Sequence, residues 1–443
     1  MSKTAIVIGA GLGGLECGIL LSKAGYRVTV LEKNAAPGGC IAGYWREGAY
    51  YDTGFHYAGS IAPGQTLDVL LKGLGLGNLP WQPLEGEEVL VRGRRYFLPF
   101  GFDAYADALS AAFPHCREEL RRYSDFLREV VQMPLAHFGE GRAMELFARS
   151  ANEYLEATIS DPLLREVLCA ASTRLPYAPE LPLYSFAQIN ASFIQGAARL
   201  EGGGETLVRA LVRALEADGG TLRCNASVQA LEAENGRICR ALLADGSRLE
   251  ADLFVSDIHP ALTTALLPPQ ALRPAYRKRI ASLRQTDGFT GYSLRFRSGA
   301  FPYPKRNYFL PPAGLFFAVP PEGEFALTAD ILVPGTRPEE AQRWIAAFDA
   351  MLPGLAASVE QISVSTPKTW ENYLGMPQGS AYGIAKDYMH PLSTVLSPRT
   401  PLENLFLTGQ NLNLHGVLGV SMTALYTCAE ILGTQWIQKQ FGR

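Results

Sequence analysis

The chain has 443 residues, of which 47% are hydrophobic, and its formal net charge is −3. This length is too great for one simple core and favours two interleaved domains. The nearly balanced charge gives no reason to expect nucleic acid as a partner. The seven cysteines include no CxxC pair, which argues against a disulfide framework or a zinc site and for a reducing compartment.

Two features bear on the cellular location. The sequence has no run of about 18 or more apolar residues, so we expect no membrane-spanning helix. The first expected strand starts almost at Met1, so we expect no signal peptide. Together they predict a cytoplasmic protein.

The most informative stretch lies near the N-terminus. Residues 4–8 are a short β-branched run, typical of a buried parallel strand, and residues 9–14 follow as a glycine-rich turn. A helical pattern comes next and ends at Gly25, and residues 27–31 form a second strand before Glu32. This order of strand, glycine turn, helix, strand and acid predicts a dinucleotide-binding unit.

Each residue type in this unit has a physical reason. Gly9 allows the tight turn, Gly11 lets a pyrophosphate approach the backbone, and Gly14 lets the helix pack against the sheet. The N–H groups that open the helix face the anion. The Glu32 carboxylate can accept hydrogen bonds from an adenosine ribose and would repel a 2′-phosphate, so FAD or NAD fits better than NADP. The alternative is a glycine-rich turn that binds nothing.

A second glycine-containing segment follows. Residues 37–40, Pro-Gly-Gly-Cys, again predict close approach of the backbone to a ligand. Residues 44–51 read as a hairpin that turns at Glu47-Gly48. The hairpin leads into residues 52–59, where Asp, His and Tyr cluster among glycines.

These segments resemble a family of FAD-dependent oxidoreductases that includes phytoene desaturases, carotenoid isomerases and retinol saturases. Residues 37–40, residues 52–57 (Asp-Thr-Gly-Phe-His-Tyr) and the first glycine motif carry the resemblance, which is closest to the saturase and isomerase branch. Many relatives have Arg where this chain has Cys40, which removes one expected cofactor contact and weakens an assignment as an amine oxidase. The resemblance implies an α/β fold, with an FAD-binding Rossmann-like (GR2-type) domain interleaved with an α+β substrate domain.

The resemblance also implies domain boundaries and cofactor contacts. The discontinuous FAD-binding domain would comprise residues 1–80, 196–260 and 396–443, and the substrate domain would comprise residues 81–195 and 261–395. Val228 would meet the adenine side of FAD. The full set of expected FAD contacts is Gly9, Gly11, Leu12, Gly13, Gly14, Glu32, Lys33, Gly38, Gly39, Val228, Gly409, Gln410, Gly419 and Val420.

The middle of the chain carries weaker signals. A helical pattern runs from about Leu120 to Ala171, and its large apolar residues lie either in the core or in a tunnel for a long apolar substrate. These residues are Met133, Phe138, Met144 and Phe147.

Strands are expected later in the middle segment, at residues 290–296, 315–319 and 325–333, as the floor of the substrate domain. Thr336 and Glu339 form a capping box that predicts the start of a helix.

The last segment is the second informative one. Residues 404–409 read as a strand that enters a turn, residues 410–420 as a glycine-rich loop, and Ser421 to about Gln438 as a helix. A glycine-rich loop before a helix start makes a second site for a polar group or anion. The alternative is an ordinary loop and terminal helix. By the resemblance, this segment lies beside the flavin and its ribityl chain.

The chemistry implied by the family requires a proton donor or acceptor beside the flavin. Adding hydrogen across a C=C bond needs hydride at one carbon and a proton at the other, and desaturation reverses this. His56 and Tyr57 are the first candidates because they lie within residues 52–59, and His415 is the second. The alternative is that His56 is structural and bonded to backbone, while Asp52 braces the loop.

The leading interpretation is therefore an FAD enzyme that saturates, desaturates or isomerises double bonds of a long apolar polyene, carotenoid or retinoid. Since the chain shows one dinucleotide fingerprint, we expect a separate electron donor or acceptor. Two alternatives stay open. One is a flavin amine oxidase relative. The other is a non-catalytic module for prenylated partners, of the Rab-escort and GDP-dissociation-inhibitor type, against which the glycine set and Glu32 argue.

An apolar substrate also implies access from a membrane, so peripheral contact with the inner face of a membrane is a hypothesis. The simpler interpretation is that the apolar residues of the last helix pack it onto the sheet. The residues concerned are Leu425, Ile431, Trp436, Ile437 and Phe441.

Overall fold

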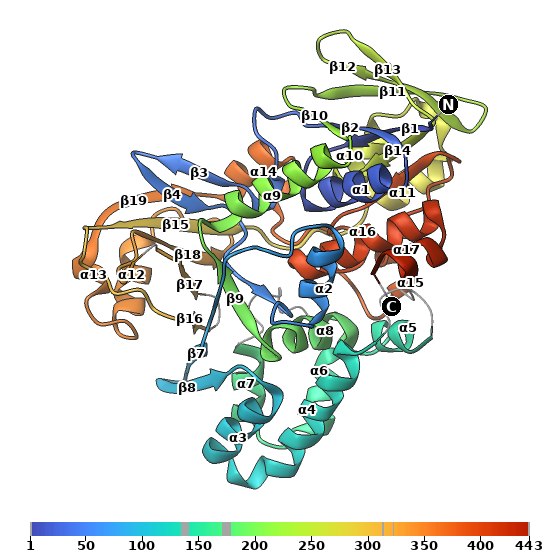
Figure 1. Cartoon of the computed structure of the whole chain (residues 1–443). Helices are drawn as coiled ribbons and strands as arrows, with labels where there is room; N and C mark the ends of the chain where they lie inside the picture. The colour runs from blue at the N-terminus through green and yellow to red at the C-terminus, as the bar shows by residue number, and fades with distance from the viewer. Residues whose placement is uncertain (1, 134–140, 171–178, 312–313, 322, 442–443) are drawn as a thin grey trace.

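A five-stranded parallel sheet holds the two ends of the chain together (Figure 1). The computed structural model describes residues 2–133, 141–170, 179–311, 314–321 and 323–441. In spatial order the strands are β10 (Thr221–Arg223), β2 (Arg27–Leu31), β1 (Thr4–Ile8), β14 (Leu253–Ser256) and β20 (Leu405–Leu407). Because every pair is parallel, the segments that follow all five strands meet at one edge of the sheet.

Both faces of this sheet are covered. On one face α1 (Leu12–Lys23) packs between α9 (Gly203–Ala217) and α16 (Gly416–Leu432). On the other, Ile6 and Ile8 of β1 join an apolar core with an antiparallel three-stranded sheet. The strands of that sheet are β11 (Val228–Glu234), β12 (Arg237–Leu243) and β13 (Arg248–Glu250). The apolar, β-branched composition of β1 thus reflects burial on both sides.

A seven-stranded mixed sheet forms the second layer system. Its order is β19 (Val359–Ser365), β15 (Phe289–Phe296), β18 (Thr328–Pro334), β17 (Gly314–Ala318), β16 (Arg306–Leu310), β7 (Gly86–Val91) and β8 (Arg94–Pro99). Figure 1 shows α12 (Ala341–Asp349) and α13 (Leu355–Ser358) on its outer side, where Trp344 and Phe348 bury their rings. The opposite face, with Phe309 and Phe317, belongs to the main core.

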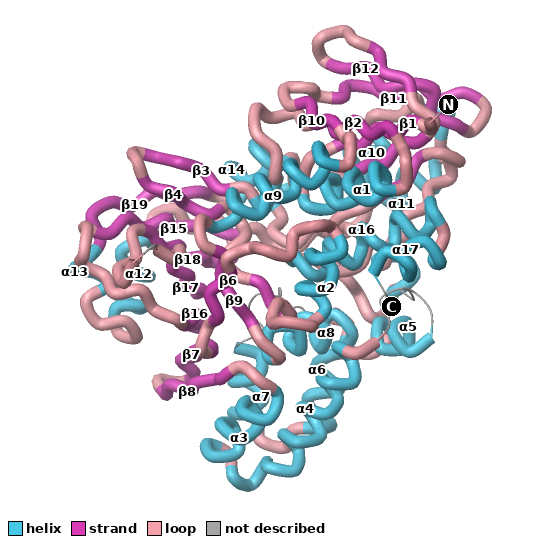
Figure 2. The backbone as a smooth tube through the Cα atoms, viewed as in Figure 1, coloured by secondary structure: helices cyan, strands magenta, loops and turns pink. Residues whose placement is uncertain are grey.

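Helices make up the lower lobe of the molecule, seen in cyan in Figure 2. They are α3 (Phe102–Ala112), α4 (Arg117–Val131), α5 (Gly141–Phe147), α6 (Ala151–Thr158), α7 (Pro162–Ala170) and α8 (Leu183–Ile194). α8 is buried along nearly its whole length and contacts α4, α5 and α6. Within the described residues, no helix is long and apolar enough to cross a membrane.

Shorter elements complete the chain. The hairpin of β3 (Gly43–Arg46) and β4 (Ala49–Asp52) turns at Glu47-Gly48, as predicted. A small sheet joins β5 (Ala58–Gly59), β9 (Ala197–Leu200) and β6 (Trp81–Pro83). The remaining helices are α2 (Thr66–Gly73), α10 (Pro260–Ala265), α11 (Pro274–Ala281), α14 (Pro367–Leu374), α15 (Pro391–Thr394) and α17 (Thr434–Phe441).

The α/β class predicted from the sequence is confirmed, but two helix starts are wrong. α12 begins after Glu340 and is not capped by Thr336. The N–H of Arg337 instead donates to Thr290 Oγ1 (2.9 Å), which holds this segment against β15. α16 begins at Gly416, five positions before the predicted Ser421, and it ends at Gly433, whose φ of +91° stops the helix before α17.

Helices α16 and α17 pack against the main core, which agrees with the simpler interpretation of their apolar residues. Leu425 and Ile437 are buried, while Ile431, Trp436 and Phe441 are partly buried against the main core. The large apolar residues of the helical region predicted from about Leu120 to Ala171 also include buried and partly buried side chains. Phe147 is fully buried, Met133 and Met144 are partly buried against the main core, and Phe138 lies outside the described residues.

One buried arginine ties the small sheet to the mixed sheet. Arg199 of β9 is 0% exposed. Its guanidinium donates to Pro304 O (3.1 Å), Arg306 O (3.0 Å) and Asn307 Oδ1 (2.6 Å). A buried charge requires such partners, and removing the guanidinium would take a donor from the buried Asn307 Oδ1 and from two partly buried carbonyl oxygens.

Arg199→Met is therefore expected to lower the free energy of unfolding by about 3 kcal/mol. Arg209→Met is the matched control, because Arg209 is exposed on α9 and its ion pair with Glu205 (3.6 Å) contributes little. Urea unfolding followed by circular dichroism measures both variants. Equal stability of the two would contradict the role given to Arg199.

Candidate functional site

A cavity of about 670 Å³ opens at the edge where the parallel strands end and continues to the mixed sheet. Its wall includes most of the predicted cofactor contacts, with Gly14 and Gly409 just outside it. The predicted residues that line it are Gly9, Gly11, Leu12, Gly13, Glu32, Lys33, Gly38, Gly39, Val228, Gln410, Gly419 and Val420. The candidate proton donors His56, Tyr57 and His415 line the same cavity.

Three glycine segments meet in this wall. A Cβ added to Gly13 would lie 3.2 Å from Cα of Gly409, and one added to Gly39 would lie 3.4 Å from Cα of Gly11. A Cβ at Gly14 would lie 2.1 Å from the carbonyl oxygen of Gly9, so Gly14 has the predicted packing role. The result is bare backbone at the N-terminus of α1, the arrangement that lets a diphosphate approach N–H groups.

Glu32 lies where the sequence predicts, directly after β2 and buried at the cavity wall. Its Oε2 accepts a hydrogen bond from the N–H of Ala10 (3.0 Å) and its Oε1 accepts one from the N–H of Asn34 (2.9 Å). Each carboxylate oxygen has a further lone pair for a ribose hydroxyl. Ala226 and Val228 line the wall on the same side. These contacts fix the orientation of the Glu32 carboxylate at the cavity wall.

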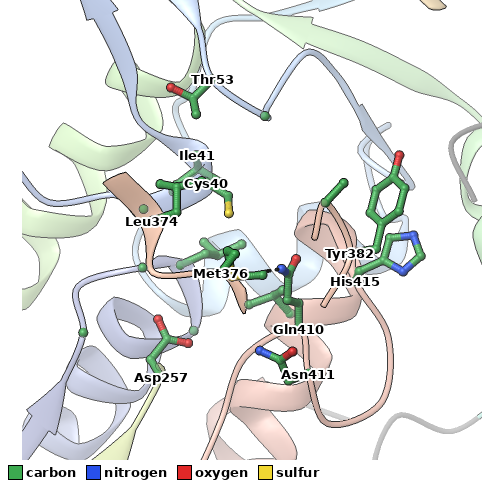
Figure 3. Close-up of a pocket in the computed structure, with 18 of the residues that line it drawn as sticks. Cys40, Ile41, Thr53, Asp257, Leu374, Met376, Tyr382, Gln410, Asn411 and His415 are labelled. Carbon is green, nitrogen blue, oxygen red and sulfur yellow. Dashed lines mark hydrogen bonds between the residues drawn. The ribbon is translucent and has the colours of Figure 1, made fainter. Parts of the chain in front are cut away.

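Asp257 is a cavity residue that the sequence analysis missed. It follows β14 directly, and its carboxylate accepts hydrogen bonds from the backbone N–H groups of Gly11 and Gly14. Figure 3 shows it at the base of the cavity. Burial, together with the negative charge of Glu32, raises the pKa of Asp257 to about 7. The available signal was its place at the carboxyl end of a buried parallel strand.

The C-terminal segment brings His415 and Gln410 to the cavity. His415 is the N-cap residue of α16, so the N–H groups of the first helical turn face this region. The ring of His415 packs on Tyr382 with centroids 4.2 Å apart, and Figure 3 shows the two rings together. Gln410 Nε2 approaches Met376 Sδ at 3.8 Å. The predicted glycine-rich loop before Ser421 is thus partly the first turn of a helix.

A partly buried lysine holds this segment in place. Lys386 Nζ donates to the carbonyl oxygens of Thr394 (2.8 Å), Asn411 (2.8 Å) and Leu412 (3.0 Å). Burial lowers the pKa of Lys386 to about 7, whereas the three carbonyl acceptors favour its protonated form. Its contacts make it a brace for residues 411 and 412.

His56 and Tyr57 lie at the opposite, mixed-sheet end of the cavity. The Tyr57 hydroxyl donates to the buried Glu87 Oε1 (3.1 Å). The His56 ring stacks on Phe317, with centroids 4.8 Å apart and planes 12° apart. Burial, with the charge of Arg199, lowers the pKa of His56 to about 3, so the ring is neutral at physiological pH.

The remaining wall at this end is mainly apolar, although Gln188 and Ser192 of α8 also line the cavity. It contains Ile189, Phe193, Phe289, Leu315, Phe317, Leu332, Leu414 and Leu418. Phe193 comes from α8 and also packs on Tyr57, with ring centroids 4.6 Å apart. Met133, Met144 and Phe147 do not line this cavity, so the tunnel role considered for them is not supported here. The cavity therefore joins a polar, glycine-lined end to an apolar end.

The comparisons with known proteins agree with this geometry. The family described as an NAD(P)-binding Rossmann-like domain matches residues 7–72. A solved structure of putrescine oxidase bound to putrescine superposes with a TM-score of 0.70 at 18% identity, over 98% of this chain and 99% of that chain. At this identity the superposition establishes the shared fold.

Sequence similarity extends over nearly the whole chain. All-trans-retinol 13,14-reductase of Danio rerio is 23% identical over 97% of this chain and 85% of its own length. Hydroxyneurosporene desaturase of Cereibacter sphaeroides is 27% identical over 95% of each chain. Over nearly its whole length the chain is therefore similar to proteins named as a retinol 13,14-reductase and a hydroxyneurosporene desaturase.

Proposed function

We propose that the protein is an FAD-dependent oxidoreductase that saturates, desaturates or isomerises carbon–carbon double bonds of a long apolar polyene, carotenoid or retinoid. One observation carries the proposal: a single cavity joins the dinucleotide-type glycine edge to an apolar compartment that contains His56 and Tyr57. The names of the similar reductase and desaturase point to the same substrate class.

The residues present fit FAD. The glycine edge would hold the diphosphate, Glu32 the adenosine ribose, and the wall near Val228 the adenine. The N-terminus of α16, with Gly419 and Val420, would lie beside the isoalloxazine ring, where the positive helix end favours negative charge. FAD bound here would supply hydride transfer. Cys40 stands where many relatives have Arg, and burial raises the pKa of its thiol to about 11.

The protein's own residues would handle position and protons. The apolar wall around Phe193, Leu315 and Phe317 would hold the polyene and exclude water. His56 and Tyr57 are the proton donors or acceptors nearest this wall. His415, across the cavity on the C-terminal segment, is the second candidate.

Other parts of the assignment are also proposals. We divide the chain into an FAD-binding domain of residues 1–80, 196–260 and 396–443 and a substrate domain made of the rest. A separate carrier, oxygen or a quinone would exchange electrons with the flavin. The likeness to putrescine oxidase keeps an amine oxidase as the second candidate function.

The first test is an anaerobic half-reaction with the purified flavoprotein. Flavin that has been reduced chemically is mixed with retinoids or acyclic carotenes, and oxidised flavin is mixed with the same compounds. We expect one of three results: reoxidation with two hydrogen atoms gained by the polyene, flavin reduction with two lost, or a changed double-bond geometry at unchanged mass. Absorbance and mass spectrometry distinguish them. Flavin reduction by putrescine, with every polyene unchanged, would favour the amine oxidase.

A glycine substitution tests the cofactor site. Gly11 has ordinary backbone angles (φ −71°), but an added Cβ would lie 2.4 Å from Asp257 Oδ2. Gly11→Ala is therefore expected to weaken FAD binding by about tenfold, or about 1.4 kcal/mol, with little loss of stability. Gly323→Ala is the control because no atom lies near its added Cβ. Fluorescence titration of the apoprotein measures both, and equal affinities would refute this cofactor position.

The pKa of Asp257 predicts how FAD binding depends on pH. Its pKa of about 7 means that the carboxyl becomes charged as the pH rises from 6 to 8, next to the expected diphosphate. We expect FAD affinity to fall by about fivefold over this range. Asp257→Asn should remove this dependence and bind FAD more tightly at pH 8. The exposed Asp245→Asn should behave as the wild type, and an unchanged pH dependence in Asp257→Asn would exclude this role.

A further inference from the structure

A chain of polar atoms runs from the cavity through the mixed sheet to the β3–β4 hairpin. His56 Nδ1 lies 3.9 Å from Asp330 Oδ2, and both side chains are nearly buried, at 7% and 3% exposed. Ser293 Oγ donates to Asp330 Oδ1 at 2.6 Å. The Tyr44 hydroxyl and Ser293 Oγ lie 3.0 Å apart. Asp330 and Ser293 face each other across the β18–β15 pair, so the sheet itself fixes the middle of the chain.

The outer end of this series of polar atoms, at Tyr44, lies near solvent. Tyr44 is half-buried in β3, and its ring stacks on Tyr51 at 5.3 Å. Its neighbours Trp45 and Arg46 are exposed. The inner end is His56, which lines the apolar part of the cavity. The series of polar atoms therefore runs from the cavity wall to a half-buried tyrosine, and the two residues that follow this tyrosine in β3 are exposed.

Two atoms of this polar series have no hydrogen-bond partner among the residues that the structure describes. They are Asp330 Oδ2 and His56 Nε2, both fully buried. A proton on Asp330 Oδ2 would point toward His56 Nδ1, while Asp330 Oδ1 accepts the Ser293 hydroxyl. This arrangement leaves the hydrogen of His56 on Nε2, the nitrogen that neither accepts nor donates a hydrogen bond within the described part of the chain. Burial raises the pKa of Asp330 to about 8 and lowers that of His56 to about 3, which agrees with a protonated acid beside a neutral ring.

We propose that His56, Asp330, Ser293 and Tyr44 form a proton relay between the substrate and solvent. The inference rests on the proposed function and adds the route by which the proton-donating group is recharged. These three partners act through His56, which alone of the four lines the cavity.

Saturation of a C=C bond would use one hydride and one proton. The FAD that the glycine edge would hold would, in its reduced form, be the source of a hydride, with its two electrons, for one alkene carbon. His56 Nε2–H gives a proton to the other carbon while Nδ1 takes the proton from Asp330 Oδ2. The imidazole changes tautomer and remains neutral, and Asp330 becomes a carboxylate. A proton from solvent then passes through the Tyr44 and Ser293 hydroxyls to Asp330 Oδ1, and rotation of the carboxyl carries it to the Oδ2 position. The His56 hydrogen, now on Nδ1, must return to Nε2 through water that enters the cavity after the product leaves, and this exchange restores the starting tautomer. Desaturation runs each step in reverse.

Two physical requirements accompany this route. The 3.9 Å gap is about 1 Å longer than a hydrogen bond, and His56 Nε2 is buried. Substrate binding must therefore bring His56 closer to Asp330 and turn Nε2 toward the cavity, as often occurs in catalytic pairs. The charges around the chain must also tolerate the carboxylate. Asp52 opposes the charge on Asp330, Arg199 opposes a charged His56, and Arg46 lies beside Tyr44. Burial raises the pKa of Tyr44 to about 12, so its hydroxyl keeps a proton to pass on.

The first test locates the resting proton and needs no turnover. In the infrared difference spectrum of wild type minus Asp330→Asn at pH 6.5, we expect the C=O stretch of a protonated carboxylic acid. Nitrogen-15 NMR, with the signal assigned by His56→Gln, should show the Nε2–H tautomer of a neutral ring. A carboxylate band for Asp330, or an imidazolium at His56, would overturn the relay whether or not the protein converts polyenes.

The second test uses the half-reaction on the flavoprotein. Tyr44→Phe should slow the proton-dependent step by roughly tenfold and Asp330→Asn by roughly a hundredfold, with KM nearly unchanged. Both should alter the solvent deuterium isotope effect. Tyr51→Phe is the matched control, because Tyr51 stacks on Tyr44 but its hydroxyl lies outside the chain. Flavin absorbance confirms that each variant holds its cofactor.

The outcomes separate the two proposals. A wild-type protein that converts no polyene contradicts the proposed function, and the spectroscopic test then still decides where the proton rests. A wild type that converts polyenes, with Tyr44→Phe and Tyr51→Phe equal in rate and in isotope effect, contradicts the relay alone.

Discussion

The structure depends on close backbone contact at the carboxyl edge of one parallel sheet. The segments after β1, β2, β14 and β20 meet there. A Cβ added to Gly13 would lie only 3.2 Å from Gly409 Cα, and one added to Gly39 would touch Gly11 Cα at 3.4 Å. Segments at both ends of the chain are therefore needed to build one wall. This constraint explains why the sheet, α1 and α16 share a single core.

A second constraint is that the polar groups around the cavity are buried. Burial favours the neutral forms of Asp257, His56 and Asp330, so the cavity can contain ionisable groups without fixed charges against an apolar guest. Oxidoreduction at carbon–carbon bonds needs protons to move in such surroundings. Neutral groups that exchange protons among themselves meet this need at lower cost than a buried ion pair.

The sequence predicted the local parts of the site well, because their signals are contiguous. The glycine turn, Glu32 and the hairpin at Glu47-Gly48 each follow from a few neighbouring residues. Asp257, Asp330 and the strand β16 were missed because their roles come from distant strands that pair in the fold. The predicted start of the last helix was wrong because tight packing at Gly419, where a Cβ would lie 2.7 Å from Leu414 Cβ, overrides the low helix propensity of glycine.

The central claim is that one cavity holds a flavin beside an apolar polyene. The most direct measurement is the visible spectrum of the purified protein, recorded with and without added FAD and then with a polyene. The account predicts the two absorption bands of an oxidised flavin, and a shift of these bands when the polyene enters the compartment beside His56. A protein that stays colourless after incubation with FAD would contradict the account and favour a binding module for prenylated partners.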